Sequence, residues 1–353
     1  MSDLLEITRK LSEKLDLSEQ ECTRAAESLP SPDVDPAQKK AFLVALHKKG
    51  ETVEEVTAFA RVFRGLAADP QLSDVAGEAI DIVGTGGSGS RGFNISSTTA
   101  FILAAAGCKV LKHGNRAITS QSGSADFLGQ HGIRMDTDPA LLRAAVKELN
   151  FCFFFAPAFH PAFKEIMPVR MELAKEGQRT VFNILGPLIN PAKPAHQLLG
   201  VFAPDWVAPL AAALHHLGLK RGIAVCSALP GGGYMDELTT AGTNHVHGFG
   251  EMVDTDTQWT PDGLGFPPAS VRDLQGGTAE ENATLLEAIT HGNGRQGLAD
   301  TLTLNAAVAF QVAGRAANLN EGCALAREIL LGGGLRDWLQ RARQFYAGTG
   351  AAE

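Results

Sequence analysis

The sequence predicts an α/β protein that begins with a helical region and continues into a larger region of alternating strands and helices. Residues up to about Pro70 contain repeated helix-start signals. From about Glu78 onwards, short apolar segments with β-branched residues alternate with helical ones. The composition agrees, because 38 glycines and an aromatic share of 7% in 353 residues suit an Ala/Gly-rich α/β enzyme better than a β-sandwich.

The helical region is marked by its caps. Residues 18–21 and 52–55 have the capping-box form, in which a Ser or Thr precedes a Glu by three positions. Asp35 followed by Pro36 is typical of an N-cap and first helical residue, and Gly50 closes that helix after two lysines. The helix that starts near Thr52 places four apolar residues on one face: Val56, Phe59, Ala60 and Phe63. No catalytic group is evident here, so we interpret this region as a packing or dimerisation unit.

The α/β region starts with a strand, a helix and a second strand. Residues 79–83 form a short apolar strand, residues 96–106 a helix of small side chains ended by Gly107, and residues 109–111 the next strand. This order predicts a right-handed βαβ unit with parallel strands. Residues 150–155 and 222–226 are further strand candidates, and the residues after Leu335 form a polar helix with a frayed end.

A glycine loop separates the first strand from the first helix of this region, and it consists of Gly84-Thr85-Gly86-Gly87-Ser88-Gly89. Glycines allow a backbone to approach an anion, and the free N–H groups of a helix start favour phosphate. The helix starts near Asn94, and hydroxyls follow at Ser96, Ser97, Thr98 and Thr99. The loop lacks the ending of a nucleotide-binding P-loop. A phosphate site and an ordinary turn therefore both remain open.

Polar residues also cluster after the second strand. Lys112-His113-Gly114-Asn115-Arg116 places two cations at the predicted carboxyl end of that strand, where open α/β sheets bind their ligands. A hydroxyl-rich segment follows, with Thr119, Ser120, Ser122 and Ser124. The alternative is a solvated loop that ends in a helix N-cap at Ser124.

Two further features have a functional and an ordinary interpretation. Asp236 and Glu237 follow three glycines and could hold magnesium against a diphosphate, or they could belong to a solvated face. Arg170, in Pro168-Val169-Arg170, could clamp a carboxylate with its planar fork, or form a surface ion pair. His245 and His247 lack an evident third metal ligand, so we interpret them as strand or loop residues.

Charge and composition exclude several classes of protein. The net charge of −8 argues against nucleic-acid binding, which needs a basic face. No segment approaches the length of a membrane span, and the N-terminus lacks the apolar core of a secretory signal. The five cysteines are widely spaced, so we expect reduced thiols in a cytoplasmic protein rather than disulfides or a zinc site.

Together these features describe a site for a diphosphate, a divalent ion and a carboxylate. The sequence that contains them resembles the anthranilate phosphoribosyltransferase family. The resemblance spans nearly the whole chain. Its motifs are DIVGTGG, FNIS, KHGNR, SGSAD, HPA, PVR, FNILGPLINPA and the acidic pair in MDE. KHGNR in register after GTGG and FNIS is a far stronger signal than any single glycine loop.

The resemblance implies a small N-terminal helical domain plus a larger α/β domain with a central, mostly parallel sheet, as in the pyrimidine nucleoside phosphorylases. The helical domain would span residues 1–72, joined by about 163–185, and the catalytic domain residues 73–345. The active-site cleft would lie between them. The implied activity is transfer of phosphoribosyl from phosphoribosyl pyrophosphate to the amine of anthranilate, in tryptophan biosynthesis. The implied assembly is a homodimer formed through the helical domain.

The resemblance also implies residue roles. Phosphoribosyl pyrophosphate would be surrounded by Gly84, Gly87, Ser88, Asn94, Ser96, Ser97, Lys112, Ser120 and Ser124. Magnesium, as two ions, would be held by Ser96, Asp236 and Glu237. Anthranilate would face Gly84, Asn115 and Arg170, with His113 and His160 nearby. Lys112 would stabilise the developing charge, Arg170 would orient the acceptor, and His113 is the best candidate for a general base.

The chain departs from the family pattern in places. Ser88 and Gly92 stand where the family usually has Asp and Thr, so we expect magnesium and phosphate binding to differ. The spacing between Arg170 and Arg179 is longer than usual, and the segment before Asp236 is unusual. Two alternatives remain. One is a related phosphoribosyltransferase or phosphorylase with another acceptor. The other is a non-catalytic paralogue that binds nucleic acid, which strong retention on heparin would support.

Overall fold

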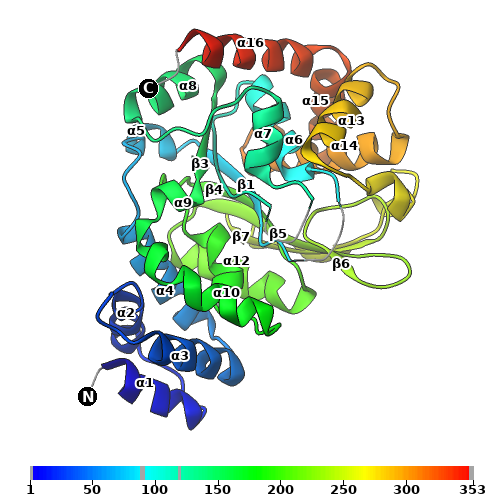
Figure 1. Cartoon of the computed structure of the whole chain (residues 1–353). Helices are drawn as coiled ribbons and strands as arrows, with labels where there is room; N and C mark the ends of the chain where they lie inside the picture. The colour runs from blue at the N-terminus through cyan, green and yellow to red at the C-terminus, as the bar shows by residue number, and fades with distance from the viewer. Residues whose placement is uncertain (1–2, 88–91, 118–120, 350–353) are drawn as a thin grey trace.

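A computed structural model describes residues 3–87, 92–117 and 121–349 of the chain (Figure 1). The N-terminal helices lie at one end of the molecule, and the C-terminal helix lies at the opposite end. A single sheet covered by helices occupies the space between them. No helix within the described ranges is both long and apolar enough to cross a membrane.

The described part of the helical region contains four helices, and the last three start at the predicted caps. They are α1 (Asp3–Ser12), α2 (Glu19–Ser28), α3 (Pro36–Lys49) and α4 (Val53–Gly65). Ser18 and Thr52 form complete capping boxes, and the Asp35 side chain accepts a hydrogen bond from the Ala37 N–H. These predictions are confirmed. The predicted apolar face of α4 is confirmed as well, because all four of its side chains are buried.

Eight strands among the described residues form one sheet. They are β1 (Ile80–Gly84), β2 (Val110–Gly114), β3 (Phe151–Phe155), β4 (His196–Gly200), β5 (Arg221–Ala228), β6 (Tyr234–Met235), β7 (Thr243–Gly250) and β8 (Asp256–Trp259). Their order is β3-β2-β1-β4-β5-β7-β8, with β6 paired to β5. Strands β1 to β5 are parallel, whereas β6, β7 and β8 pair antiparallel. The predicted mostly parallel sheet is therefore confirmed.

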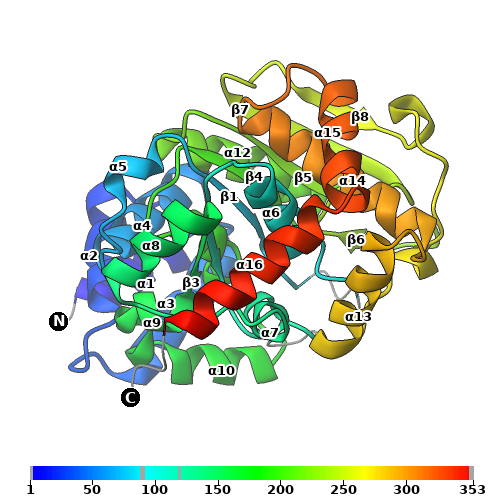
Figure 2. The same cartoon turned by 90° about the horizontal axis from the view of Figure 1, so that it is seen from above.

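The remaining helices cover this sheet or connect its strands. The α-helices are α5 (Ser73–Ala76), α6 (Ile95–Ala105), α7 (Ser124–Gln130), α8 (Pro139–Leu149), α9 (Ala156–Phe159), α10 (Met167–Lys175), α11 (Phe182–Leu185), α12 (Val207–His216), α13 (Ala279–Thr290), α14 (Gln296–Val312), α15 (Leu319–Leu331) and α16 (Gly334–Gly348). Short 3-10 turns are η1 (Pro161–Glu165), η2 (Gly186–Leu188), η3 (Pro204–Trp206), η4 (Asp262–Leu264) and η5 (Val271–Leu274). Seen from above, α16 crosses the layer that contains α6 and α8 (Figure 2).

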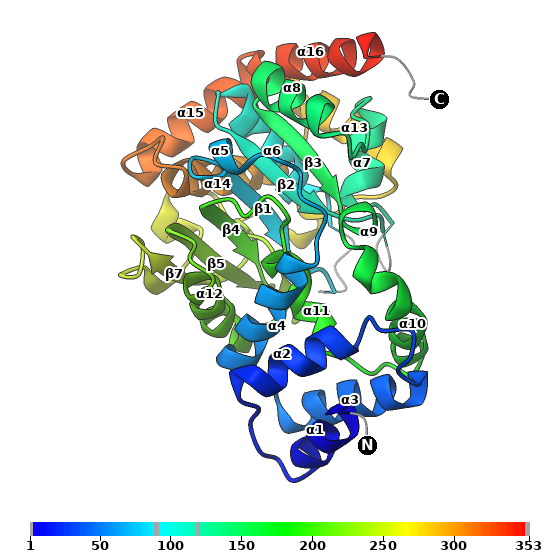
Figure 3. The same cartoon turned by 90° about the vertical axis from the view of Figure 1, so that its left-hand side faces the viewer.

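Two hydrophobic cores lie on opposite faces of the sheet, because successive strand residues point to opposite sides. Ile82 and Leu198 belong to a core with α6, α14 and α16. Val83 and Leu199, their chain neighbours, belong to a second core with α12 and the N-terminal helices. Figure 3 shows α12 and α4 on one side of the strands. The N-terminal helices therefore share a continuous core with one face of the sheet.

A connecting segment, residues 156–189, runs from β3 to the N-terminal helices. The Lys39 ammonium of α3 donates to the carbonyl of Glu165 at 3.3 Å. The neighbouring Lys40 pairs with Glu172 and Glu176 of α10 at 2.6 and 2.7 Å. The Phe63 ring of α4 lies against aromatic rings of this segment. Helices α3 and α4 thus hold the connecting segment in place, while the division of the chain into two domains stays a prediction.

The strand order creates a crevice beside the glycine loop. The chain runs from β1 to β2 and β3 in one direction, then returns to β4 and β5 on the other side of β1. The last paired residues of β1 and β4, Gly84 and Gly200, lie opposite each other at the carboxyl edge. Open α/β sheets bind ligands at such a point, since the loops after the two strands diverge.

Candidate active site

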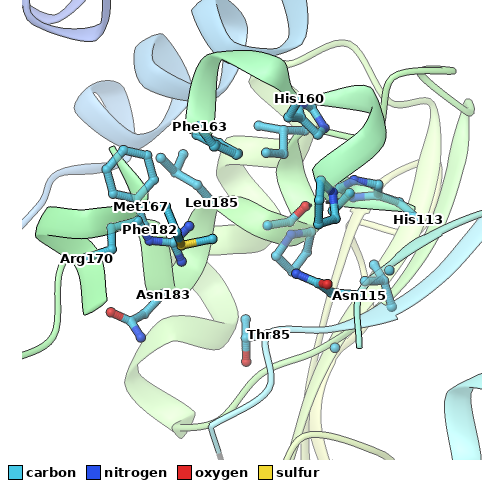
Figure 4. A pocket seen from close by; sticks show the side chains of 18 of the residues that line it. Thr85, His113, Asn115, His160, Phe163, Met167, Arg170, Phe182, Asn183 and Leu185 are labelled. Carbon is cyan, nitrogen blue, oxygen red and sulfur yellow. Dashed lines mark hydrogen bonds between the residues drawn. The ribbon is translucent and has the colours of Figure 1, made fainter. Parts of the chain in front are cut away.

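A pocket of 620 Å³ lies beside this edge of the sheet (Figure 4). One wall comes from the ends of β1 and β2 and the residues that follow them, and the other comes from the connecting segment. Its lining residues are Val83, Gly84, Thr85, His113, Gly114, Asn115, Ala156, Pro157, His160, Pro161, Phe163, Lys164, Met167, Arg170, Phe182, Asn183, Leu185, Gly186, Pro187 and Ile189. The size suits a small aromatic ligand together with part of a second molecule.

Arg170 is held in this pocket by aromatic rings. Its guanidinium lies 5.0 Å from the ring centroid of Phe182 and 5.9 Å from that of Phe163. Burial lowers the pKa of Arg170 to about 10, so the group stays charged at neutral pH. No carboxylate in the described part of the chain forms an ion pair with it. A half-buried cation without an anionic partner at a pocket wall suits a carboxylate ligand.

Two histidines form the inner part of the pocket. The rings of His113 and His160 lie 5.1 Å apart, in an edge-to-face arrangement. Burial lowers the pKa of His113 to about 3 and that of His160 to about 4, so both rings are neutral at pH 7. His113 Nδ1 lies 3.2 Å from the carbonyl of Gly186 and therefore carries the ring proton. The Nε2 atoms of both rings are buried and have no partner among the described residues, so His113 Nε2 can accept a hydrogen bond.

The acidic pair lies directly across the carboxyl edge of β1 and β4. The N–H of Gly86 donates to Asp236 Oδ2 at 2.9 Å. A Cβ at Gly84 would stand 2.7 Å from the same oxygen, and a Cβ at Gly200 only 1.7 Å from the Asp236 carbonyl oxygen. Only glycine at these two positions leaves room for Asp236. Because Gly84 also lines the pocket, the acidic pair and the pocket adjoin each other.

Glu237 lies at the start of α6. The backbone N–H of Ser96 donates to Glu237 Oε1 at 3.1 Å. Burial, and then the charge of Asp236, raise the pKa of Glu237. Two adjacent, partly buried carboxylates fit a divalent cation, which would neutralise them. Since no three His, Cys, Asp or Glu side chains converge within the described ranges, the Ser96 hydroxyl and substrate oxygens would have to complete the ligand set.

Lys112 lies within a strand, whereas the sequence predicts that it follows the strand. The predicted strand at 109–111 continues to Gly114, so Lys112 is inside β2 rather than after it. Its side chain is fully buried, and its ammonium donates to the carbonyl of Ile82. The Asp81 carboxylate accepts from the His113 N–H at 3.3 Å and from the Asn190 amide at 2.8 Å. The backbone pairing of β1 with β2 is limited to Ile80 and Val110 at their amino ends. Beyond that pair the side chains of Lys112 and Asp81 connect the two strands, and the lysine is buried there.

The other expected phosphoribosyl pyrophosphate residues lie around the start of α6 and α7. Asn94 precedes α6, and its amide bonds to Ser122 and Asn282. Ser97 faces the core and is fully buried. Ser124 is the first residue of α7 rather than its N-cap, which is Gly123. Gly87 is exposed with a positive φ of 76°. Ser88 and Ser120 lie outside the described residues.

The structure thus brings the five residues expected around anthranilate into one pocket: Gly84, His113, Asn115, His160 and Arg170. Phe163 and Phe182 were not predicted as site residues, although Phe182 begins the FNILGPLINPA motif and Phe163 directly follows HPA. The sequence reasoning also did not single out Gly200, whose only signal is a strand that ends in glycine. Asn282 carries no local signal, because its partners are far away in the chain.

The bundle of helices and the sheet with its edge crevice define a glycosyltransferase. Residues 5–67 match the family model described as glycosyl transferase family, helical bundle domain. Residues 76–334 match the glycosyl transferase family, a/b domain. The chain is therefore an enzyme of this glycosyltransferase class.

Comparison with individual relatives identifies the family within this class of glycosyltransferases. The chain is 44% identical to the anthranilate phosphoribosyltransferase of Rhodospirillum rubrum, over 92% of this chain and 90% of that protein. It is 40% identical to the enzyme of Rhizobium meliloti, over 97% and 98%. The crystal structure of the Thermus thermophilus enzyme superimposes with a TM-score of 0.85 at 38% identity, over 98% of this chain and 100% of the other. The chain belongs to the anthranilate phosphoribosyltransferase family, which confirms the resemblance and the predicted fold.

Proposed function

We propose that this protein transfers the phosphoribosyl group of phosphoribosyl pyrophosphate to the amine of anthranilate, releasing pyrophosphate, as a step of tryptophan biosynthesis. The observation that carries the proposal is Arg170, a cation without an anionic partner in the described chain, held on two aromatic rings in a pocket that adjoins the acidic pair. A flat ring with a carboxylate beside its amine fits such a pocket.

The second substrate would occupy the crevice between the glycine loop and the start of α6. A yeast anthranilate phosphoribosyltransferase of known structure, 25% identical over 98% of each chain with a TM-score of 0.79, is in complex with phosphoribosyl pyrophosphate and Mg. This likeness supports Mg²⁺ as the metal here, with Ser96, Asp236 and Glu237 as ligands, and we propose two ions. Bound Mg²⁺ would neutralise charge on the diphosphate, the leaving group.

In the proposed reaction, the amine nitrogen forms a bond to the anomeric carbon while the bond from that carbon to the diphosphate oxygen breaks. The nitrogen then loses one proton, which the released pyrophosphate or solvent takes up. The amine of anthranilate is neutral at pH 7, so its lone pair is available without a base. Arg170 would fix the carboxylate so that the amine points at the anomeric carbon, and orientation of this kind lowers the barrier substantially. Lys112, buried with its amino group on the Ile82 carbonyl, would add positive charge beneath the glycine loop.

In this proposal His113 does not act as a general base. Its low pKa means that a proton taken from the amine would not stay on the ring. Its neutral ring lines the pocket and would contact the acceptor there, which would help to point the amine at the ribose. The neutral His160 ring beside it would add no charge to the inner part of the pocket.

Three broader features belong to the proposal. Residues 1–72 with about 163–185 would form the helical domain, and residues 73–345 the catalytic domain, which the contacts of Lys39 and Lys40 with the connecting segment support. The protein would act as a homodimer through the helical domain. It would work in the cytoplasm.

The test is direct. Purified protein is incubated with Mg²⁺, phosphoribosyl pyrophosphate and anthranilate, and the loss of anthranilate fluorescence is followed. We expect a decrease that requires all three additions. Aniline, which lacks the carboxylate, and 4-aminobenzoate, in which the carboxylate is displaced, serve as matched acceptors and should react far more slowly. Equal rates with aniline would refute the carboxylate-binding pocket, and no loss of fluorescence would refute the activity.

A further inference from the structure

The side-chain amide of Asn94 lies where three segments distant in sequence meet. Asn94 precedes α6, Ser122 belongs to the loop before α7, and Asn282 belongs to α13. The Ser122 hydroxyl donates to Asn94 Oδ1 at 2.8 Å, and Asn282 Nδ2 donates to the same oxygen at 2.7 Å. The carbonyl oxygen of the Asn94 amide is therefore engaged by two donors.

The orientation of both amides follows from one backbone group. The N–H of Gly277 can only donate, and it lies 2.8 Å from Asn282 Oδ1. The NH₂ group of Asn282 must then be the end that faces Asn94. The Asn94 atom that receives it must be an acceptor, namely Oδ1. The oxygen and nitrogen of Asn94 are thus assigned by a chain of hydrogen bonds that begins at Gly277.

Asn282 is placed rigidly. Its side chain is fully buried. The loop before α13 is joined to the segment before α6, since the Phe93 N–H donates to the Leu274 carbonyl at 3.1 Å and Gly92 forms a bridge with Gln275. A Cβ at Gly276 would stand 2.7 Å from the Phe93 Cα, so the two segments are in close contact. The donor of Asn282 therefore has little freedom to move away from Asn94.

We propose that Asn282 is a positioning residue for phosphoribosyl pyrophosphate, which acts by turning the NH₂ group of Asn94 towards the anion. This inference rests on the proposed function, in which Asn94 contacts that substrate. With Oδ1 satisfied, the end of Asn94 left for the substrate is the donor end, and one of its hydrogens has only a long contact, 3.4 Å, to the Ser122 carbonyl. A reversed amide would present a carbonyl oxygen to phosphate oxygens and repel them.

Two substitutions isolate this role. Asn282→Asp keeps the shape and the acceptor for Gly277 but replaces the donor with an oxygen. Asn282→Ala removes the donor without adding a charge, although it also removes the acceptor for the Gly277 N–H. We expect each to weaken the binding of phosphoribosyl pyrophosphate with Mg²⁺, measured by calorimetry, about tenfold or more, as for loss of a hydrogen bond to a charged ligand. The Michaelis constant for anthranilate should change much less.

A double-mutant cycle with Asn94→Ala decides whether the effect passes through Asn94. If it does, the Asn282 substitutions should change the affinity less than about twofold in the Asn94→Ala background. The same loss in both backgrounds would overturn the inference, because the effect would then come from charge or from distorted folding. Asn293→Asp, at an exposed position just after α13, adds the same charge and should leave binding unchanged.

Calorimetry also separates this inference from the proposed function. If the wild-type protein binds phosphoribosyl pyrophosphate but does not consume anthranilate, the proposed acceptor is wrong, while the cycle still reports on Asn282. If the protein is active and the cycle is additive, the proposed function holds and the positioning role of Asn282 is wrong.

Discussion

The carboxylate of Asp236 lies so close to the main chain of Gly84 that a Cβ there would stand 2.7 Å from its Oδ2 atom. On the other side, a Cβ at Gly200 would stand 1.7 Å from the Asp236 carbonyl oxygen. The two glycines face each other across β1 and β4. The acidic pair therefore occupies its place only because both strands end in a residue without a side chain.

These two glycines should respond differently to a methyl group. Gly200→Ala meets a backbone carbonyl that cannot move alone, so we expect a loss of unfolding free energy of about 1–3 kcal/mol, as for other overpacked sites. Gly84→Ala meets the end of a side chain, which can rotate. We expect near-normal stability in urea but a higher Mg²⁺ concentration for half-maximal activity. Gly129→Ala, where a Cβ meets nothing within 4 Å, is the matched control. Identical Mg²⁺ titrations for Gly84→Ala and wild type would contradict this.

Neutralising the acidic pair should abolish turnover without unfolding the protein. Burial and the neighbouring charge of Asp236 already raise the pKa of Glu237, so the metal-free fold gains little from these charges. For Asp236→Asn with Glu237→Gln we expect a melting temperature in chelator equal to or above that of the wild type. With phosphoribosyl pyrophosphate present, Mg²⁺ should raise the melting temperature of the wild type only. Full activity of the double variant, or of the wild type in excess chelator, would remove the metal role.

Replacing Arg170 should separate the two substrates. The guanidinium lies on Phe182 and Phe163 in the wall formed by the connecting segment, so its loss should affect the acceptor. We expect Arg170→Ala to raise the Michaelis constant for anthranilate about ten- to a hundredfold, equivalent to about 1.5–3 kcal/mol. The constant for phosphoribosyl pyrophosphate should change little. Arg170→Lys should restore only part of the loss, because an ammonium lacks the planar fork.

The kinetic pattern for Arg170 has two alternatives. A surface ion pair predicts almost no change for either substrate. Equal defects for both substrates would mean that Arg170 organises the whole cleft, and the carboxylate clamp would have to be abandoned. Steady-state kinetics with each substrate varied in turn distinguishes all three patterns.

A buried histidine outside the site should contribute to acid sensitivity. His131 lies against Phe127 and Phe101, and burial lowers its pKa to about 4. Neither of its ring nitrogens has a hydrogen-bond partner in the described chain. Its unfolded pKa is about 6.5. The unfolded state therefore binds the proton first, and stability falls as the pH decreases from about 6.5 towards 4.

We expect this one group to cost the wild type about 2–3 kcal/mol between pH 7 and pH 4.5. His131→Phe, which keeps an aromatic ring among its aromatic neighbours, should lose less stability than the wild type over that range. Urea unfolding at the two pH values measures the difference. His216→Gln, at an exposed position on α12, serves as control. An equal loss in His131→Phe and wild type would show that other groups dominate.

The sequence by itself determined the elements whose signals are local. Caps at Ser18, Asp35 and Thr52 are contacts between residues within three positions of each other, so they can be read from the chain. The same holds for the first βαβ unit, whose two strands are parallel as predicted. The motifs around the glycine loop, KHGNR and Arg170 were sufficient to identify the family. They also predicted five residues that line one pocket.

Only the tertiary structure decided how those segments meet. Strand β4 pairs with β1 although they are far apart in the chain, and this pairing places Gly200 beside Asp236. Lys112 lies inside β2 because that strand pairs with β3 as far as Gly114. Asn282 reaches Asn94 across 188 positions of sequence. Such contacts depend on strand order and on the packing of distant helices, for which a local pattern of residues contains no physical signal.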